Sequence, residues 1–322
     1  MDIMPAIENV IRNHERILID KFTLGDKTFD AEVFKSWMSG GAKKLRELFF
    51  EEESDPYKLD LHKLCYLFKY MPSMYHSSYS LINAWKNRHF QNWISKFEDI
   101  GICSLGSGPG SDIFGIIFAL NNKIPDFNIK IKNIIRREKT ITWEHYYQCV
   151  KTSIFNINIT NNLQVYDSLK EKYLKNMNPQ FSETLSQCHD EWVCDTSENW
   201  VKTYLYSQCN LISLQHVISD PSQTNSGNGP KGVKAISEEL LDILSATKKP
   251  TILLISDINS QKIIDSIESL KHKISKSFNI KEVLKTETNN NIKMDYTDYL
   301  KSFKNMVCNY NHYQTIWEIN DK

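Results

Sequence analysis

Three glycines at alternate positions, Gly106, Gly108 and Gly110, mark the stretch of the chain best suited to hold a ligand. A short apolar run, Ile102–Leu105, precedes them, and Ser111 can cap the apolar helix that follows. A glycine has no Cβ, so a ligand can approach the backbone closely and the residue can adopt a positive φ. The N-terminus of the next helix presents N–H groups that attract a carboxylate or a phosphate. Strand, glycine turn and helix in this order are typical of the start of a nucleotide-binding α/β unit.

An acidic residue, Glu138, follows the second predicted strand, where apolar and charged residues alternate over Ile129–Ile135. A carboxylate at a strand tip can accept hydrogen bonds from both hydroxyls of a ribose, and this is the role we favour. The alternative is an ion pair with a neighbouring basic residue: Arg136, Arg137 or Lys139. Trp143, five residues beyond Glu138, is placed where its ring can cover adenine.

The segment Ile102–Asp112 resembles the first motif of the class I S-adenosylmethionine (SAM) methyltransferases. A dinucleotide fingerprint has its last glycine three residues after the second, and here that spacing is one residue tighter. In the methyltransferase family the loop curls around the amino-acid half of the cofactor, which implies SAM contacts for Ser104, Gly106, Ser107, Gly108 and Gly110. Ser104 stands where the family has an acidic residue, and the sequence leaves open whether Asp112 takes over that role.

Two later segments resemble the family in their order and chemistry. Glu191–Asp195 is a predicted short strand that ends in an acid, and the family position accepts a hydrogen bond from the adenine amino group, which implies that role for Asp195. Asn210–Ile218 resembles the fourth motif, where the chain passes the transferable methyl group, which implies that Gln215 contacts the cofactor.

Methyl transfer depends mainly on aligning the acceptor, the methyl carbon and the sulfur, and such alignment is worth roughly 7–11 kcal/mol. A base is needed only if the acceptor carries a proton that must leave early. His216 is the candidate base because imidazole titrates near neutrality. The alternative is a histidine that is hydrogen-bonded at the edge of the cofactor and contributes shape. Gln215 and Asp220 are candidates to orient the acceptor.

The acceptor is narrowed by motifs that the chain lacks. Enzymes that methylate base amino groups resemble one another in an Asn/Asp-Pro-Pro-Tyr/Phe motif, whereas Asp220-Pro221-Ser222 has neither the second proline nor the aromatic ring. Cytosine C5 enzymes need a thiolate that follows a proline, and no Pro-Cys pair occurs here. A nitrogen or oxygen on an RNA, a protein or a small molecule is therefore expected, with an RNA or a small molecule favoured. The basic stretches 129–139 and 271–281 favour RNA, whereas neutral overall charge favours a smaller acceptor.

The composition is that of an ordinary globular protein, with 41% hydrophobic and 24% charged residues in 322. Lys plus Arg and Asp plus Glu number 39 each, so no global field attracts nucleic acid or an anionic membrane. Seven scattered cysteines indicate reduced thiols, and the start of the chain has no signal-peptide pattern. The longest apolar stretch, Ile113–Leu120, is too short to span a bilayer. We therefore expect a cytoplasmic protein with no membrane partner.

No metal site is expected from the local spacing of ligand residues. Cys188, His189 and Cys194 are close together, but their spacing fits no standard zinc pattern and no fourth ligand is evident.

The predicted fold is α/β: a seven-stranded, Rossmann-like methyltransferase sheet with helices on both faces and, as the resemblance implies, an antiparallel last strand. Residues 1–98 are predicted to form an N-terminal helical cap, and residues 99–322 the SAM-binding domain. An insertion is expected around 146–187 and a flexible loop over 220–234, where Gly, Pro, Ser and Asn are abundant.

Three functional classes are compatible with these features. The favoured one is a SAM-dependent methyltransferase. A nicotinamide- or flavin-dependent oxidoreductase uses the same strand, glycine turn and helix, but its glycine spacing is wider. The third is a catalytically inactive relative that serves as a binding or scaffold protein, and Ser104 in place of an acid is the feature in its favour.

Overall fold

The computed structural model describes residues 3–14, 36, 40, 60–86, 90–121, 130–138, 141–155, 188–218, 230–293 and 307–322. The chain divides into two compact units. The sheet unit comprises Met74–Ile141, Pro179–Asn290 and Tyr310–Lys322. The helical unit comprises Met1–Ser73, Thr142–Asn178 and Asn291–Asn309. The division into a cap over 1–98 and a SAM-binding domain over 99–322 stays a prediction.

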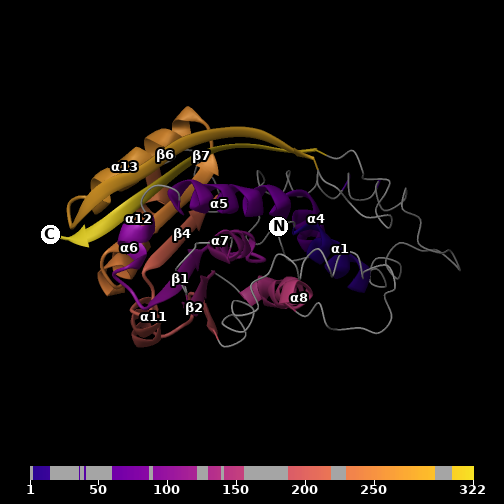
Figure 1. The fold of residues 1–322 in the computed structure, drawn as a ribbon, viewed down its shortest axis with the longest axis horizontal. Helices are drawn as coiled ribbons and strands as arrows, with labels where there is room; N and C mark the ends of the chain where they lie inside the picture. Colours follow the sequence, from indigo (N-terminus) through magenta and orange to yellow (C-terminus); the bar gives the residue numbers. More distant parts are fainter. Residues whose placement is uncertain are drawn as a thin grey trace, which may run out of the picture. The chain divides into compact units, whose positions relative to one another are not determined.

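Seven strands form one sheet, and they follow one another in space in the order β3-β2-β1-β4-β5-β7-β6. The neighbours from β3 to β5 are parallel, and β7 runs antiparallel to β5. β6 and β7 run side by side at the end of the sheet (Figure 1). The strands are β1 (Asp99–Leu105), β2 (Lys130–Arg137), β3 (His189–Val193), β4 (Leu211–Gln215), β5 (Thr251–Ile258), β6 (Phe278–Lys293) and β7 (Val307–Asp321). The predicted seven-stranded α/β sheet with one antiparallel strand is confirmed.

The central strands are apolar on both sides because helices cover both faces of the sheet. Side chains of one face, such as Cys103, Ile212 and Leu253, share a buried cluster with residues of three helices. These helices are α11 (Asn199–Tyr206), α12 (Pro230–Ala246) and α13 (Gln261–Ile274). Residues of the other face contact α5 (Met71–Lys86) and α7 (Ser111–Asn121), as in the hydrogen bond between Ser77 and Ser256. α6 (Phe90–Ile94) reaches the start of β5 through Trp93, which donates to the Pro250 carbonyl.

α5 and α7 approach each other so closely that only glycine fits at position 115. A Cβ at Gly115 would lie 2.5 Å from the carbonyl oxygen of Tyr75 and 3.0 Å from Cβ of Ser78. The two helices therefore pack with their backbones close together at this point, and α5 is held against the helix that follows the glycine turn.

The described part of the helical unit contains α1 (Met4–Asn13), α4 (Asp60–Lys69) and α8 (Glu144–Phe155), with a short 3-10 turn at Ile141–Trp143 before α8. α1 lies beside α8, and the Asn9 amide of α1 donates to the Ser153 hydroxyl of α8 over 2.8 Å. Among the described helices, none is long and apolar enough to cross a membrane.

Several predicted boundaries differ from those observed. α12 begins at Pro230, so the last five residues of the predicted flexible loop, 230–234, are helical. Proline suits the first turn of a helix, which explains this start and the start of α5 one residue before Pro72. α8 occupies the first part of the predicted insertion, whereas residues 156–187, residues 219–229 and with them Asp220 lie outside the described ranges.

Candidate active site

The glycine turn joins β1 to α7 in a conformation that requires glycine. Gly106, Gly108 and Gly110 have φ values of 64°, 50° and 83°, in the left-handed region that L-residues avoid. The Gly106 N–H donates to the Arg137 carbonyl over 2.8 Å, which ties the turn to the end of β2. A Cβ at Gly106 would lie 3.0 Å from the Val217 side chain, so the turn also has little space toward the end of β4.

Two hydroxyl groups in the turn are buried without a hydrogen-bond partner. Ser107 and Ser111 are each 3% exposed, and neither Oγ has a partner within the described residues. A buried polar atom without a partner costs roughly 1–3 kcal/mol. The turn is therefore built to receive polar groups from a ligand, which fits the cofactor that the sequence predicts here.

Asp112 brings a carboxyl group to Ser104. The Ser104 hydroxyl donates to Oδ2 of Asp112 over 2.7 Å, and Ser213 of β4 and the Ile113 N–H also donate to this carboxyl group. Burial raises the pKa of Asp112, and these hydrogen bonds oppose the shift. Asp112 thus supplies an acid beside Ser104, the position where the methyltransferases that the sequence resembles have one, and it also occupies the N-terminus of α7.

Glu138 lies against the glycine turn from the end of β2. Its N–H donates to the Val193 carbonyl over 3.0 Å, and its carboxylate accepts a hydrogen bond from the Gly108 N–H. The structure therefore brings Glu138, the residue predicted to bind the ribose, to the glycine turn. Its two basic neighbours pair with other carboxylates: Arg136 with Asp190, and Arg137 with Asp195 and Glu239.

The two residues predicted to bind adenine lie in different units. Asp195 follows β3 in the sheet unit, where Arg137 holds its 58% exposed carboxylate. Trp143 belongs to the helical unit, and its buried ring packs against Tyr66 with a centroid separation of 5.1 Å. Their adenine contacts stay predictions.

Gln215, the last residue of β4, connects this strand to α5. Its amide nitrogen donates to the Met74 carbonyl over 2.6 Å and to the Ser78 hydroxyl over 3.0 Å. The side chain is 7% exposed, so it fixes the position of α5 beside the strand ends.

His216 follows β4 with a φ of 57°, which is uncommon for a residue other than glycine. Its ring lies between two partners. Nε2 is 2.9 Å from Nε2 of His312, and Nδ1 is 3.9 Å from Oδ1 of Asp257. The Asp257 carboxylate is itself held by the Ile218 and Ile258 N–H groups. These contacts on both ring nitrogens fix the orientation of the His216 side chain at the end of a central strand.

His312 extends this network to α5. Its Nδ1 is 2.7 Å from the Ser77 hydroxyl, which also receives the Gln314 amide and contacts Ser256. Burial lowers the pKa of His312 to about 2, and burial also lowers the pKa of His216 although Asp257 opposes it. Both rings are therefore neutral at pH 7, and one shared proton joins them.

Sequence reasoning identified His216 and missed the groups around it. Polar residues in two strands were the available signal: Ser256 and Asp257 at the end of the apolar β5, and His312 and Gln314 beside aromatic residues in β7. Nothing in the local pattern showed that these strands and Ser77 of α5 meet at the end of β4.

The glycine turn and His216 follow β1 and β4, which are adjacent although they are not consecutive in the chain. Strand order reverses at this point, and α/β sheets bind ligands in the crevice outside the carboxyl ends of such strands. The parallel order 3-2-1-4-5 with an antiparallel β7 inserted before β6 completes the pattern. The chain has the class I SAM-dependent methyltransferase fold.

No protein-family model matches the chain, and no curated protein matches it. Similar solved structures include the plantazolicin methyltransferase BpumL in complex with SAH, at 12% identity and a TM-score of 0.39, covering 90% of this chain and 98% of that one. A putative O-methyltransferase from Klebsiella pneumoniae has 8% identity and a TM-score of 0.36, covering 96% of both chains. Precorrin-6y C5,15-methyltransferase from Geobacter metallireducens GS-15 has 9% identity and a TM-score of 0.35, covering 76% of this chain and 88% of that one. These similarities are distant, and the fold assignment rests on the strand order.

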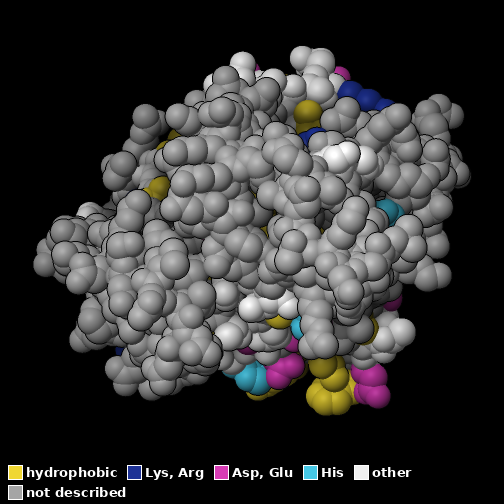
Figure 2. Space-filling view, turned by 90° about the vertical axis from the view of Figure 1, so that its right-hand side faces the viewer, with side chains coloured by type: hydrophobic (Ala, Val, Ile, Leu, Met, Phe, Trp, Pro, Cys, Tyr) yellow, Lys and Arg dark blue, Asp and Glu magenta, His cyan; other side chains and the backbone are white. Residues whose placement is uncertain are grey.

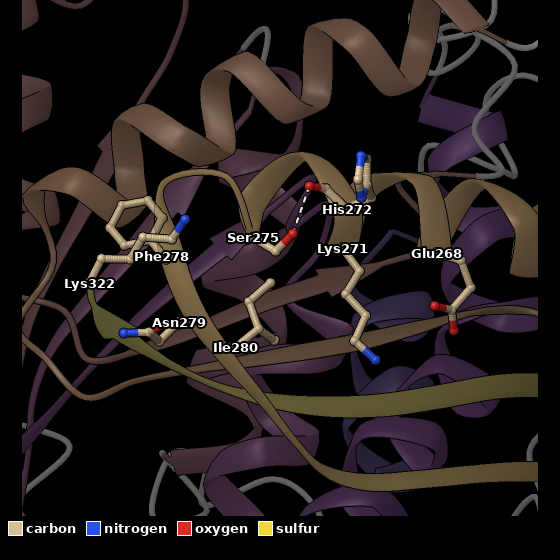
Figure 3. A pocket seen from close by; sticks show the side chains of 8 residues that line it. All are labelled: Glu268, Lys271, His272, Ser275, Phe278, Asn279, Ile280 and Lys322. Atoms are coloured by element: carbon tan, nitrogen blue, oxygen red, sulfur yellow. Dashed lines mark hydrogen bonds between the residues drawn. The ribbon is translucent and has the colours of Figure 1, made fainter.

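A pocket of about 550 Å³ lies away from the glycine turn and His216, beside the edge strand β6. Its lining comes from the end of α13, the start of β6 and Lys322 (Figure 3). Polar side chains such as Lys271 and Asn279 dominate it, and Ser275 donates to the His272 carbonyl over 2.8 Å. Phe278 lies beside Lys249, just before β5, so the pocket is near the amino ends of the parallel strands and is separate from the glycine turn.

Proposed function

We propose that this protein is a SAM-dependent methyltransferase that acts on a nitrogen or oxygen of its acceptor. One observation carries the proposal: at the switch point of the sheet, the buried hydroxyls of Ser107 in the positive-φ glycine turn and of Ser111 at the start of α7 have no partner among the described residues. Such a turn presents backbone and hydroxyl groups to a ligand that reaches the protein's main chain. When bound, SAM supplies an electrophilic methyl carbon on a sulfonium.

The charges around the turn favour SAM over a dinucleotide. A dinucleotide places its pyrophosphate at the glycine turn and the helix N-terminus, where free N–H groups receive it. Here the Gly108 N–H already donates to the Glu138 carboxylate, and the Ile113 N–H donates to the Asp112 carboxyl group. The Glu138 carboxylate at the turn repels a pyrophosphate and attracts the ammonium and sulfonium groups of SAM.

Each candidate residue has a defined task in this proposal. Ser104 and Asp112 support the turn, while the backbone of Gly106 to Gly110 and the Ser107 hydroxyl contact the amino-acid half. Glu138 binds the ribose, Asp195 accepts from the adenine amino group, and Trp143 covers the ring. The Gly108 contact of Glu138 shows that its side chain reaches the turn.

His216 is proposed as a positioning residue more than as a base. The nearby Asp257 carboxylate favours a proton on Nδ1 of His216, so Nε2 accepts the shared proton of His312. The lone pair that a base would use is then directed at His312. Alignment of the acceptor by the fixed ends of β4 and α5, with Gln215 joining them and Asp220 following, provides the catalytic effect.

A small, weakly charged acceptor is favoured over RNA. Lys plus Arg equals Asp plus Glu over the whole chain, at 39 each, so long-range attraction to a polyanion is weak. On the face seen in Figure 2, the visible described side chains are of mixed type, with hydrophobic, basic, acidic and histidine groups. We also propose a cytoplasmic location, because none of the six described cysteines is in a disulfide, as in a reducing compartment.

Ligand-dependent unfolding of the full chain tests the cofactor. We expect S-adenosylhomocysteine to raise the free energy of unfolding, by about 2.7 kcal/mol at a hundred times its Kd, and NAD and FAD to have no effect. Stabilisation by NAD or FAD in place of S-adenosylhomocysteine would refute the assignment. If S-adenosylhomocysteine binds but SAM is never consumed with any nitrogen or oxygen acceptor, the binding-protein alternative is favoured.

A further inference from the structure

A second cluster of chemically reactive side chains lies in the helical unit, whose residues have no part in the proposed methyl transfer apart from Trp143. His145 and Cys149 are one turn apart on α8, so they project from the same face of the helix. His14, directly after α1, faces them. Nε2 of His14 is 3.0 Å from Nε2 of His145, and Sγ of Cys149 is 3.7 Å from the same His145 atom.

These separations are close to those of ligands around one metal ion. Zinc binds nitrogen at about 2.0–2.1 Å and sulfur at about 2.3 Å in tetrahedral geometry, which places two nitrogens about 3.3 Å apart and nitrogen and sulfur about 3.6 Å apart. The two measured distances differ from these values by a few tenths of an ångström, and all three ligand atoms lie within 4.8 Å of one another.

The buried histidine is already oriented as a ligand. Nδ1 of His14 is 2.7 Å from the Val10 carbonyl oxygen, so this nitrogen carries the proton and Nε2 presents a lone pair. A carbonyl on the far nitrogen is the usual outer contact of a metal-binding histidine. The Tyr146 ring stacks on His14 at a centroid distance of 5.0 Å and holds its plane. The lone pair therefore points at the space that His145 and Cys149 share.

We propose that His14, His145 and Cys149 bind a divalent transition-metal ion, with zinc as the preferred occupant. Two imidazoles and a thiolate are a donor set for zinc, and three protein ligands leave a fourth position for water or another group. On binding, the Cys149 thiol loses its proton to solvent, and the proton of His145 moves to Nδ1, so each metal ion releases one proton. This site goes beyond the proposed methyl transfer and does not depend on it.

The sequence could not indicate this site, because its ligands come from two segments more than a hundred residues apart. The cluster that local spacing did suggest, around Cys188, His189 and Cys194, provides matched controls. His189 is an exposed histidine and Cys194 a partly exposed cysteine, in the sheet unit.

Titration of the chelator-treated full chain with Co²⁺ tests the proposal. We expect one equivalent to produce the visible bands of tetrahedral Co²⁺ and a sulfur-to-cobalt charge-transfer band, and one equivalent of Zn²⁺ to remove both. Cys149→Ser should abolish the charge-transfer band, and His145→Ala should weaken binding by more than about 10-fold, because each removes a ligand. His189→Ala and Cys194→Ser should bind as the unaltered protein does.

His145 is exposed and Cys149 is partly exposed, so neither substitution is expected to disturb the fold, and circular dichroism of each metal-free variant checks this. The Co²⁺ titration of the unaltered protein tests the metal site even if a variant fails to fold. The proposal would be overturned if Co²⁺ gave no charge-transfer band. It would also be overturned if Cys194→Ser abolished the band and Cys149→Ser did not. Zinc should also raise the unfolding temperature of the unaltered protein, and an equal rise in Cys149→Ser would contradict the assigned ligands.

Discussion

Two buried serines beside the glycine turn differ in what their hydroxyl groups contact. Ser104 donates to the buried Asp112 carboxyl group over 2.7 Å, whereas the hydroxyl of Ser107 has no partner among the described residues. A hydrogen bond to a buried partner stabilises the fold, and an unpartnered buried hydroxyl does not. The same substitution at the two positions therefore separates stability from ligand binding.

Ser107→Ala should leave the stability of the cofactor-free protein unchanged or slightly higher, because no hydrogen bond is lost. In the proposed complex the hydroxyl contacts the cofactor, so its removal should raise the Kd for S-adenosylhomocysteine about 2- to 12-fold. Calorimetric titration measures the Kd, and urea unfolding measures the stability. An unchanged Kd would remove Ser107 from the binding site.

Ser104→Ala should instead lower the free energy of unfolding by about 1–3 kcal/mol, because the buried Asp112 carboxyl group loses one hydrogen-bond donor. Urea unfolding without ligand measures this loss. If the two alanine variants were equally stable, the contact between Ser104 and Asp112 would not contribute to the fold.

At the level of helices and strands, the site depends on how α5 sits beside α7 and the ends of β4 and β5. Gly115 allows the close approach, and Gln215 and Ser77 supply hydrogen bonds across it. The position of α5 is therefore decided by backbone proximity and buried polar contacts together.

Gly115→Ala should destabilise the protein although alanine favours a helix by about 1 kcal/mol. The new Cβ would lie 2.5 Å from the Tyr75 carbonyl oxygen, so the two helices must separate, at a cost of roughly 1–3 kcal/mol for such overpacking. Urea unfolding should show a net loss of about 1–2 kcal/mol. Ser269→Ala on the exposed side of α13 is the control and should change stability by less than about 0.5 kcal/mol.

The buried histidine pair predicts how stability depends on pH. The pKa of His312 is lowered to about 2, and that of His216 is also lowered, both mainly by burial. Below the unfolded pKa of about 6.5 the unfolded chain binds protons that the native rings do not, so stability falls as pH falls. The His312 ring contributes a slope of about 1.4 kcal/mol per pH unit, and the His216 ring adds a slope of the same sign.

His312→Gln should keep a donor toward His216 and remove one of these slopes. Between pH 6.5 and 5 the free energy of unfolding of the variant should then fall less steeply, by about 1.4 kcal/mol per pH unit. His76, whose pKa burial lowers to about 4, adds a slope of the same sign to both proteins. Equal slopes in urea unfolding across this range would show that His312 is protonated in the native protein.

For the chain taken as a whole, charge balance is the property that bears on the acceptor. With 39 basic and 39 acidic residues, the protein has no net attraction for a polyanion. It should therefore leave a heparin column at or below roughly 0.2 M salt, because few counterions are released on binding. Retention well above that concentration would favour RNA as the acceptor.

The sheet and the glycine turn were predictable because each depends on local properties of the chain. Apolar runs such as Thr251–Ile258 form buried strands wherever both faces are covered, and alternate glycines impose a turn through their own φ angles. The seven strands and the turn at 106–110 followed from these patterns, whereas the antiparallel direction of β7 followed from the family resemblance. β6 and β7 continue into polar sequence, since pairing with each other satisfies the backbone of their polar portions.

The polar contacts depend on approach distances between segments that are far apart in the chain. Ser77 beside His312, His312 beside His216 and His14 beside His145 are each set by how two elements pack. Hydropathy and residue spacing describe one element at a time, whereas a hydrogen bond or a metal site needs atoms of two elements within about 3 Å. The chain's local chemistry therefore predicts where a nucleotide cofactor binds, and the packing of helices on the sheet sets which side chains surround it.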